Sequence, residues 1–250
     1  MTRTVMIAAM VREVQRLVRR WRRTSVGDEE RRFAAFVAGD VAVVISGIGK
    51  RNAEVAARAA VIHYRPAKLI SVGLAGALAG DLGTGSVVTP EIVVDAADGT
   101  EYRCAAAGGT PGGVLLTASK IAGADAKAAL AEQFHARLVD MEAAGVARAA
   151  QAARCGFRCV KAISDDAGFV MPPLAQFVDA AGHFHGGRFA AWAAVRPWQW
   201  SRVALLGRNA AYAARALCRR LAQDLSGNDG AIEVVTLDRP EFPDVVQGRR

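Results

Sequence analysis

The chain has 250 residues, of which 52% are hydrophobic and 22% are charged, a composition typical of a soluble globular enzyme and not of a disordered or fibrous protein. The formal net charge is +8, with the excess of arginine concentrated in residues 12–32 and 196–220. Such a surface can attract nucleic acid, anionic lipid or a phosphorylated substrate, or it can simply be solvated. Because the sequence has no zinc-finger, basic-zipper or basic–aromatic RNA-binding motif, we expect no nucleic-acid partner.

Apolar runs alternate with segments of helical periodicity through most of the chain. Strands are expected at residues 5–9, 33–37, 41–45, 69–73, 85–95 (interrupted at Pro90), 114–117, 138–140 and 157–163. Helices are expected at residues 11–21, 52–64, 122–134, directly after Glu142, and at 200–221. Strands that alternate with helices predict an α/β fold of three layers (α/β/α) with a central mixed β-sheet.

The character of the sequence changes after Met171. Residues 172–200 are rich in Phe, Trp, His, Gly and Arg, and we interpret them as an insertion within a domain that covers residues 1–222. Residues 223–250 show little periodicity and are expected to form a partly disordered tail. No apolar run approaches the roughly 20 residues of a membrane-spanning helix, and residues 1–10 lack the pattern of a signal peptide, so we expect a cytoplasmic protein.

The glycines do not form a nucleotide fingerprint. Around Lys50, Val44 stands where a phosphate-binding P-loop needs its first glycine, and Arg51 replaces the Ser or Thr that binds the metal. The dinucleotide spacing G-x-G-x-x-G and the nucleophile elbow G-x-S-x-G do not occur, and the four histidines lack metal-ligand spacing. We therefore expect neither a cofactor nor a metal site.

Carboxylates that follow buried strands are the most informative residues. Glu142 follows the strand at 138–140 and opens an alanine-rich helix, and Asp165 follows the strand at 157–163. The carboxyl ends of strands are where an open α/β sheet places its chemistry. Taken alone, Asp165 could also be a helix cap, and Glu13 an ordinary surface acid.

Together with these acids, several short motifs resemble one superfamily. In chain order they are Ile7-Ala8-Ala9-Met10 with Glu13, Ser46-Gly47-Ile48-Gly49-Lys50, Gly73-Leu74-Ala75-Gly76, Val139-Asp140-Met141-Glu142-Ala143 and Lys161-Ala162-Ile163-Ser164-Asp165. Over residues 5–168 the chain resembles the nucleoside phosphorylase and nucleosidase superfamily, in particular the methylthioadenosine/S-adenosylhomocysteine nucleosidases. The resemblance implies a nucleoside phosphorylase-like fold, a homodimer and release of adenine from an adenosine-type nucleoside.

The resemblance also implies the role of each site residue. Asp165, with Ser164 and Ile121, corresponds to the purine site, where the aspartate supplies or shares the proton that the leaving base needs. Glu142 corresponds to the carboxylate that binds the ribose hydroxyls, with Met141 under the sugar. Glu13 corresponds to the base that activates water. The residues that correspond to the loop near the nucleophile or phosphate are Gly49, Gly73 and Leu74.

Two departures from the superfamily bear on the substrate. Phosphorylases bring Arg and Ser to the phosphate near the glycine loop, where this chain has Ser71-Val72-Gly73-Leu74, which favours water over phosphate as the nucleophile. Residues 172–200 resemble the hopanoid-associated phosphorylases, which implies adenosylhopane as the substrate in hopanoid biosynthesis. The Trp and Arg residues of this segment suit a peripheral contact at the inner membrane face or the mouth of an apolar channel, or they simply pack against the core.

Other functions remain open at this point. Phosphorolysis at the same site would make the protein a purine nucleoside phosphorylase. A methylthioadenosine/S-adenosylhomocysteine nucleosidase would act on a small substrate without a hydrophobic 5′ group. Outside enzymes, the scaffold could be a non-catalytic protein that binds nucleosides or lipids.

Overall fold

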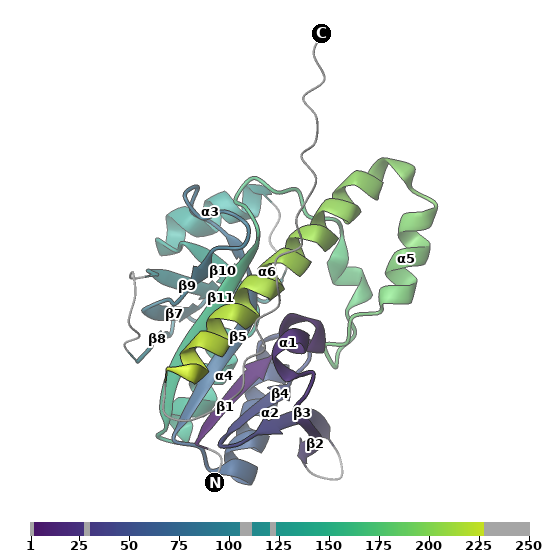
Figure 1. The fold of residues 1–250 in the computed structure, drawn as a ribbon. Helices are drawn as coiled ribbons and strands as arrows, with labels where there is room; N and C mark the ends of the chain where they lie inside the picture. Colours follow the sequence, from purple (N-terminus) through teal and green to yellow (C-terminus); the bar gives the residue numbers. More distant parts are fainter. Residues whose placement is uncertain (1–2, 28–30, 106–111, 121–123, 228–250) are drawn as a thin grey trace.

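The computed structural model describes residues 3–27, 31–105, 112–120 and 124–227 (Figure 1). Within these residues, eleven strands form one mixed sheet: β1 (Thr4–Ala8), β2 (Arg22–Gly27), β3 (Arg32–Ala38), β4 (Val41–Ile45), β5 (Lys68–Ala77), β6 (Val87–Val88), β7 (Ile92–Asp95), β8 (Glu101–Arg103), β9 (Val114–Thr117), β10 (Leu138–Asp140) and β11 (Gly156–Asp165). The helices are α1 (Val11–Val18), α2 (Lys50–Tyr64), α3 (Ala124–Phe134), α4 (Ala143–Ala152), α5 (Gly186–Ala194) and α6 (Trp200–Ser226), with short 3₁₀ turns at Leu174–Phe177 and Pro197–Gln199.

Strand β5 is the centre of the sheet. The strand order is β2-β3-β4-β1-β5-β10-β9-β7-β8, and β11 pairs with β5 along the length of β5 and also with β6. Strands β1 and β11 run parallel to β5, whereas β10 is antiparallel to it. The expected three-layer α/β fold with a central mixed sheet is therefore confirmed.

The two faces of the sheet follow the period-2 alternation of its strands. In β1, Val5 and Ile7 pack with alanines of α2 and α4, whereas Met6 and Ala8 pack with residues of α1 and α6. The small alanine side chains allow α2 and α4 to approach the sheet and each other closely, and Figure 1 shows α6 crossing the opposite face. Alternation in the strands and alanine on the helices thus account for the layered core.

Some boundaries differ from the sequence prediction. Helix α1 ends at Val18 and not at residue 21, and Arg22–Gly27 forms an edge strand that pairs with β3. This strand was missed because its side chains are mostly polar and exposed, so it lacks an apolar pattern. Helix α6 continues to Ser226, so the domain boundary expected at residue 222 falls inside a helix. The rest of the predicted tail, residues 228–250, lies outside the described residues.

The predicted insertion at 172–200 contains α5 and both 3₁₀ turns. Figure 1 shows α5 beside the amino-terminal half of α6, where α6 extends beyond the sheet. The segment has its own small aromatic cluster, because the Phe189 ring lies 5.3 Å from Phe177 and 5.8 Å from Trp192. Among the residues that the structure describes, no helix combines the length and apolar character that crossing a membrane requires.

Helices α2 and α4 are in contact at Gly145, and this contact predicts a large effect of a small substitution. A Cβ atom at Gly145 would lie 2.2 Å from the carbonyl oxygen of Lys50, so Gly145→Ala must push the two helices apart. We expect a loss of about 1–3 kcal/mol in the free energy of unfolding, measured by urea denaturation. The control is Gly207→Ala in α6, where a Cβ meets nothing within 4 Å and should stabilise the helix by about 0.5–1 kcal/mol. Equal stability of Gly145→Ala and the parent would contradict this account of the helix packing.

Candidate active site

A cavity of about 350 Å³ lies where β1, β5 and β11 end. Its lining includes predicted site residues from four separate segments, namely Glu13, Leu74, Met141, Glu142, Ser164 and Asp165. The insertion and α6 contribute a largely apolar wall that includes Leu174, Val178, Phe184, Phe189, Val203 and Leu206. The cavity therefore joins a group of carboxylates to an apolar compartment.

Glu13 is held at the first turn of α1. Its Oε2 accepts a hydrogen bond of 3.3 Å from the backbone N–H of Met10, the residue that precedes the helix. Only 3% of Glu13 is exposed. Burial raises the pKa of Glu13 to about 7, against the opposing effects of the nearby Lys161 charge and of the Met10 hydrogen bond. A carboxylate whose pKa lies near neutrality can both take and release a proton under physiological conditions.

Glu142 precedes α4 and reaches the loop before α2. Its Oε1 accepts a hydrogen bond of 2.8 Å from the backbone N–H of Gly49, whose φ of 105° favours glycine. Burial raises the pKa of Glu142 to about 7, and the neighbouring charge of Asp140 adds to the effect. Gly49 does not line the cavity itself, so its contribution is to hold the carboxylate that does.

Asp140 and Lys161 form a buried ion pair behind these acids. The Lys161 Nζ lies 2.8 Å from Asp140 Oδ2, and both side chains are almost fully buried. Burial is the largest single effect and lowers the pKa of Lys161, but the charges of Asp140, Cys159 and Glu142 and the hydrogen bond to Asp140 together outweigh it, so the pKa of Lys161 rises above its usual range. Asp140 also accepts hydrogen bonds from the Thr117 hydroxyl and the Ala143 backbone N–H. Its oxygens are thus occupied by protein groups.

Asp165 has two protein partners. Its Oδ1 accepts a hydrogen bond of 2.7 Å from the hydroxyl of Ser164, and its Oδ2 lies 2.5 Å from Nζ of Lys127 in α3. Lys127 also donates to the backbone carbonyl of Asp166 at 2.7 Å. Lys127 lines the cavity but was not predicted from the sequence. A single lysine within an alanine-rich helix is the one signal that could have drawn attention to it.

Two glycines of β5 leave space for these charged groups. A Cβ at Gly73 would lie 3.2 Å from Glu13 Oε2 and 3.6 Å from Lys161 Nζ. A Cβ at Gly76 would lie 2.8 Å from Asp165 Oδ2 and 3.3 Å from Lys127 Nζ. Gly73 therefore lies against the Glu13 carboxylate and does not line the cavity, whereas Leu74 does line it.

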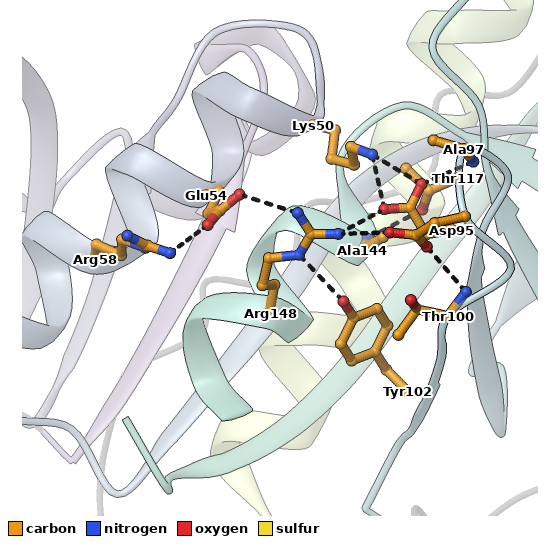
Figure 2. Close-up of polar contacts among 11 residues, drawn as sticks. Lys50, Glu54, Arg58, Asp95, Ala97, Thr100, Tyr102, Thr117, Ala144 and Arg148 are labelled. Atoms are coloured by element: carbon orange, nitrogen blue, oxygen red, sulfur yellow. Dashed lines mark hydrogen bonds and ion pairs between the residues drawn. The ribbon is translucent and has the colours of Figure 1, made fainter. Parts of the chain in front are cut away.

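Figure 2 shows an ion network that joins Asp95 to Lys50 and Arg148. Asp95, at the end of β7, binds Lys50 at 2.7 Å and Arg148 at 3.1 Å, and Arg148 also donates to the hydroxyl of Tyr102 at 3.2 Å. Lys50 is the first residue of α2 and Arg148 lies in α4. The network therefore ties together the helices whose ends provide Gly49 and Glu142.

Of the site residues proposed from the sequence, Glu13, Met141, Glu142, Ser164 and Asp165 line one cavity. Strand β5 lies between β10, which leads to Glu142, and β11, which carries Asp165, so these two strands are not neighbours in the sheet. The predicted base-site residue Ile121 lies outside the described residues. Within the described part of the chain, the His, Cys, Asp and Glu side chains form no group that could hold a metal ion.

Comparison with known proteins agrees with this architecture. The sequence profile described as the Phosphorylase superfamily matches residues 3–114. The S-adenosylhomocysteine nucleosidase from Streptococcus pyogenes, solved with 5-methylthiotubericidin, has a TM-score of 0.66 at 20% identity, over 92% of this chain and 98% of that chain. The 5′-methylthioadenosine/S-adenosylhomocysteine nucleosidase from Neisseria meningitidis, solved with methylthio-immucillin-A, has a TM-score of 0.67 at 17% identity, over 91% and 100%.

A futalosine hydrolase mutant from Helicobacter pylori is more distant, with a TM-score of 0.57 at 17% identity over 65% of this chain and 89% of that chain. Among curated proteins, none matches the sequence significantly. At these identities the structural likeness shows a shared fold. The fold is thus that of the nucleoside phosphorylases and nucleosidases, and the match over residues 3–114 relates the chain to the phosphorylase superfamily.

The raised pKa of Glu13 predicts a pH-dependent gain in stability when the charge is removed. The folded-state pKa of about 7 exceeds the ordinary value of 4.5, so the folded protein holds this proton more tightly than the unfolded chain. The contribution of protonated Glu13 to the free energy of unfolding is therefore complete below about pH 4.5 and is lost as the pH rises through 7. Glu13→Gln should therefore gain up to about 3 kcal/mol relative to the parent between pH 4.5 and 8 in urea unfolding. Glu91→Gln, at an exposed position, is the control, and a difference that is constant with pH would contradict the buried-acid account.

Proposed function

We propose that this protein cleaves the N-ribosyl bond of an adenosine-type nucleoside and releases adenine, with water as the nucleophile. The observation that carries the proposal is that Glu13, Glu142 and Asp165, distant in the sequence, line one cavity. Cleavage of a ribosyl C–N bond develops positive charge on the sugar and negative charge on the leaving base. A site for this reaction therefore needs a base for water, a carboxylate for the sugar and a proton source at the purine.

The geometry supports one role for each acid. Glu142, which is held by the Gly49 N–H, can accept hydrogen bonds from the ribose hydroxyls. Met141 lies beside it in the cavity lining. Glu13, with its pKa near 7, can take the proton of the attacking water. Asp165, in β11, lies on the opposite side of β5 from β10 and Glu142, and we assign the leaving purine to this side. In this proposal the sugar lies between the water site at Glu13 and the base site at Asp165.

The charge of the cavity favours water over phosphate. Asp140 and Asp165 are paired with lysines, but the ionised forms of Glu13 and Glu142, which also line the cavity, would repel a phosphate dianion. Arg12, Lys120 and Lys127 line the cavity as well and could attract an anion, although the Arg12 guanidinium lies over the Phe184 ring at 5.4 Å and Lys127 is paired with Asp165. Phosphorolysis is therefore the second candidate, and it is separated from hydrolysis by whether added phosphate yields ribose 1-phosphate instead of free sugar.

The apolar wall supports a hydrophobic group at the 5′ position of the substrate. Phe184, Phe189, Val203 and Leu206 line the cavity and provide an apolar surface against which a hydrophobic 5′ substituent could pack. Adenosylhopane, which the resemblance of residues 172–200 suggests, is one substrate of this kind. A methylthioadenosine-like substrate would leave most of this wall uncovered.

The test is adenine release from a panel of adenosines whose 5′ substituents range from hydroxyl through methylthio to long alkyl chains. We expect release by the parent, with kcat/KM increasing with the apolar length of the substituent. Asp165→Asn should lower the rate by about 10²–10⁴-fold, because the base site loses its acidic group. Asp81→Asn, at an exposed position, is the control. Undiminished release by Asp165→Asn would refute the assigned base site, and no release from any substrate would favour a non-catalytic binding protein.

We further propose that the turn between α5 and α6 contacts an anionic membrane surface. Val195, Trp198 and Trp200 are 69%, 68% and 56% exposed there. Residues 180–223 contain no Asp or Glu, so the charged side chains of this segment are all basic. Tryptophan with arginine suits the interface of an anionic bilayer. Trp192 does not belong to this surface, because it packs against Phe189 and Arg196.

Vesicle flotation tests the membrane contact. The parent should float with vesicles that contain phosphatidylglycerol and should bind less to vesicles of phosphatidylcholine alone. The double variant Trp198→Ala/Trp200→Ala should lose flotation several-fold, whereas Ile62→Ala, which removes an equally exposed apolar side chain from α2, should not. Equal flotation of the double variant and the parent would rule out this surface. The homodimer that the resemblance implies stays a proposal, tested by sedimentation.

A further inference from the structure

Lys127 is a buried cation that the roles proposed above leave unused. Its exposed fraction is 2%, although lysine is rarely buried to this degree. Removing an ammonium group from water costs several kcal/mol unless it is paired and hydrogen-bonded. A buried lysine on the wall of the cavity, in contact with the acid of the base site, therefore calls for a role at that site.

The Lys127–Asp165 pair is built into the fold. Lys127 comes from α3, Asp165 from the end of β11, and the strand beside them, β5, has Gly76 at the point of contact. A Cβ at Gly76 would lie 2.8 Å from Asp165 Oδ2 and 3.2 Å from the Lys127 Cε, so it would collide with both partners. Three separate elements thus provide the space and the groups for this pair.

The hydrogen bonds around Asp165 are those of an ionised carboxylate. The Ser164 hydroxyl donates to one oxygen and the Lys127 ammonium to the other. Of the three N–H groups of the ammonium, one donates to Asp165 and one to the carbonyl oxygen of Asp166. Within the described part of the chain the third meets no acceptor, and Lys127 lines the cavity.

We propose that Lys127 is the proton donor to the leaving purine and that Asp165 holds and orients its ammonium group. This inference rests on the proposed function, and it changes the role of Asp165 from the acid to the partner of the acid. A lysine can act in this way because its ammonium releases a proton, whereas the guanidinium of arginine stays charged.

The step balances without any further reactant. The C1′–N9 bond breaks and its electron pair stays on the purine, which takes a proton at N7 from Lys127. Water adds to C1′ and its proton passes to Glu13. Exchange with solvent returns a proton to Lys127 and removes one from Glu13, so each turnover consumes one water molecule.

Two substitutions separate a proton donor from a structural ion pair. Lys127→Arg keeps the positive charge beside Asp165 but supplies no proton, so adenine release should fall by about 10²–10⁴-fold between about pH 5 and pH 9. Lys127→Met removes the charge as well. A buried carboxylate without its cation binds a proton more readily, so this variant should keep its rate best near pH 5 and lose it as the pH rises. Lys68→Met, at the opposite end of β5, is the control and should follow the parent profile.

Each outcome decides the proposal. Parent-like rates and pH profile in Lys127→Arg would show that only the charge matters and would overturn the donor role. If Lys127→Arg does not fold, as judged by its melting temperature, Lys127→Met decides: a rate well below that of the parent at every pH supports the donor role, and a parent-like rate near pH 5 overturns it. If the parent releases no adenine from any adenosine, the proposed function itself fails and the donor role fails with it.

Discussion

The arrangement of the site depends on the space beside a single strand, β5. Glu13 and Lys161 lie against Gly73, and Asp165 and Lys127 lie against Gly76, all of them nearly inaccessible to solvent. A side chain on Gly76 would displace Asp165 or Lys127 and leave the other buried without its partner, which costs several kcal/mol, and a side chain on Gly73 would press on Glu13. The glycines of β5 are therefore needed for the charges to be buried as they are, and the cavity above them follows from the same requirement.

The buried charges differ in how they are stabilised. Asp140 is fully engaged by Lys161, Thr117 and the start of α4, so it serves the architecture of the site. Glu13 and Glu142 have backbone donors but form no salt bridge with any residue that the structure describes, and burial brings the pKa of each to about 7. The two acids that can exchange a proton near neutral pH are thus those without a direct cation. The network of Asp95, Lys50 and Arg148 holds the helix ends that position Glu142 (Figure 2).

The segment at 172–200 gives the cavity an apolar wall in addition to its charged residues. Its rings pack on one another and cover the cavity with apolar side chains, while the turn before α6 leaves Val195 and Trp198 exposed. The sequence alone leaves open whether these aromatic residues pack inward or face a membrane. The structure divides them: Trp192 packs inward, and Trp198 does not.

The sequence by itself determined the layered α/β fold, because period-2 strands and alanine-rich helices are local patterns. It also indicated Glu142 and Asp165 through their places after buried strands, and Glu13 through the resemblance of short motifs to a known superfamily. It could not reveal that β5 separates β10 from β11, nor that Lys127 reaches Asp165 from a helix 38 positions earlier. Strand order and long-range ion pairs depend on how distant segments pack against each other, and no local pattern records this. Only the tertiary structure decided which charged side chains of the cavity form ion pairs and which carboxylates remain able to exchange a proton.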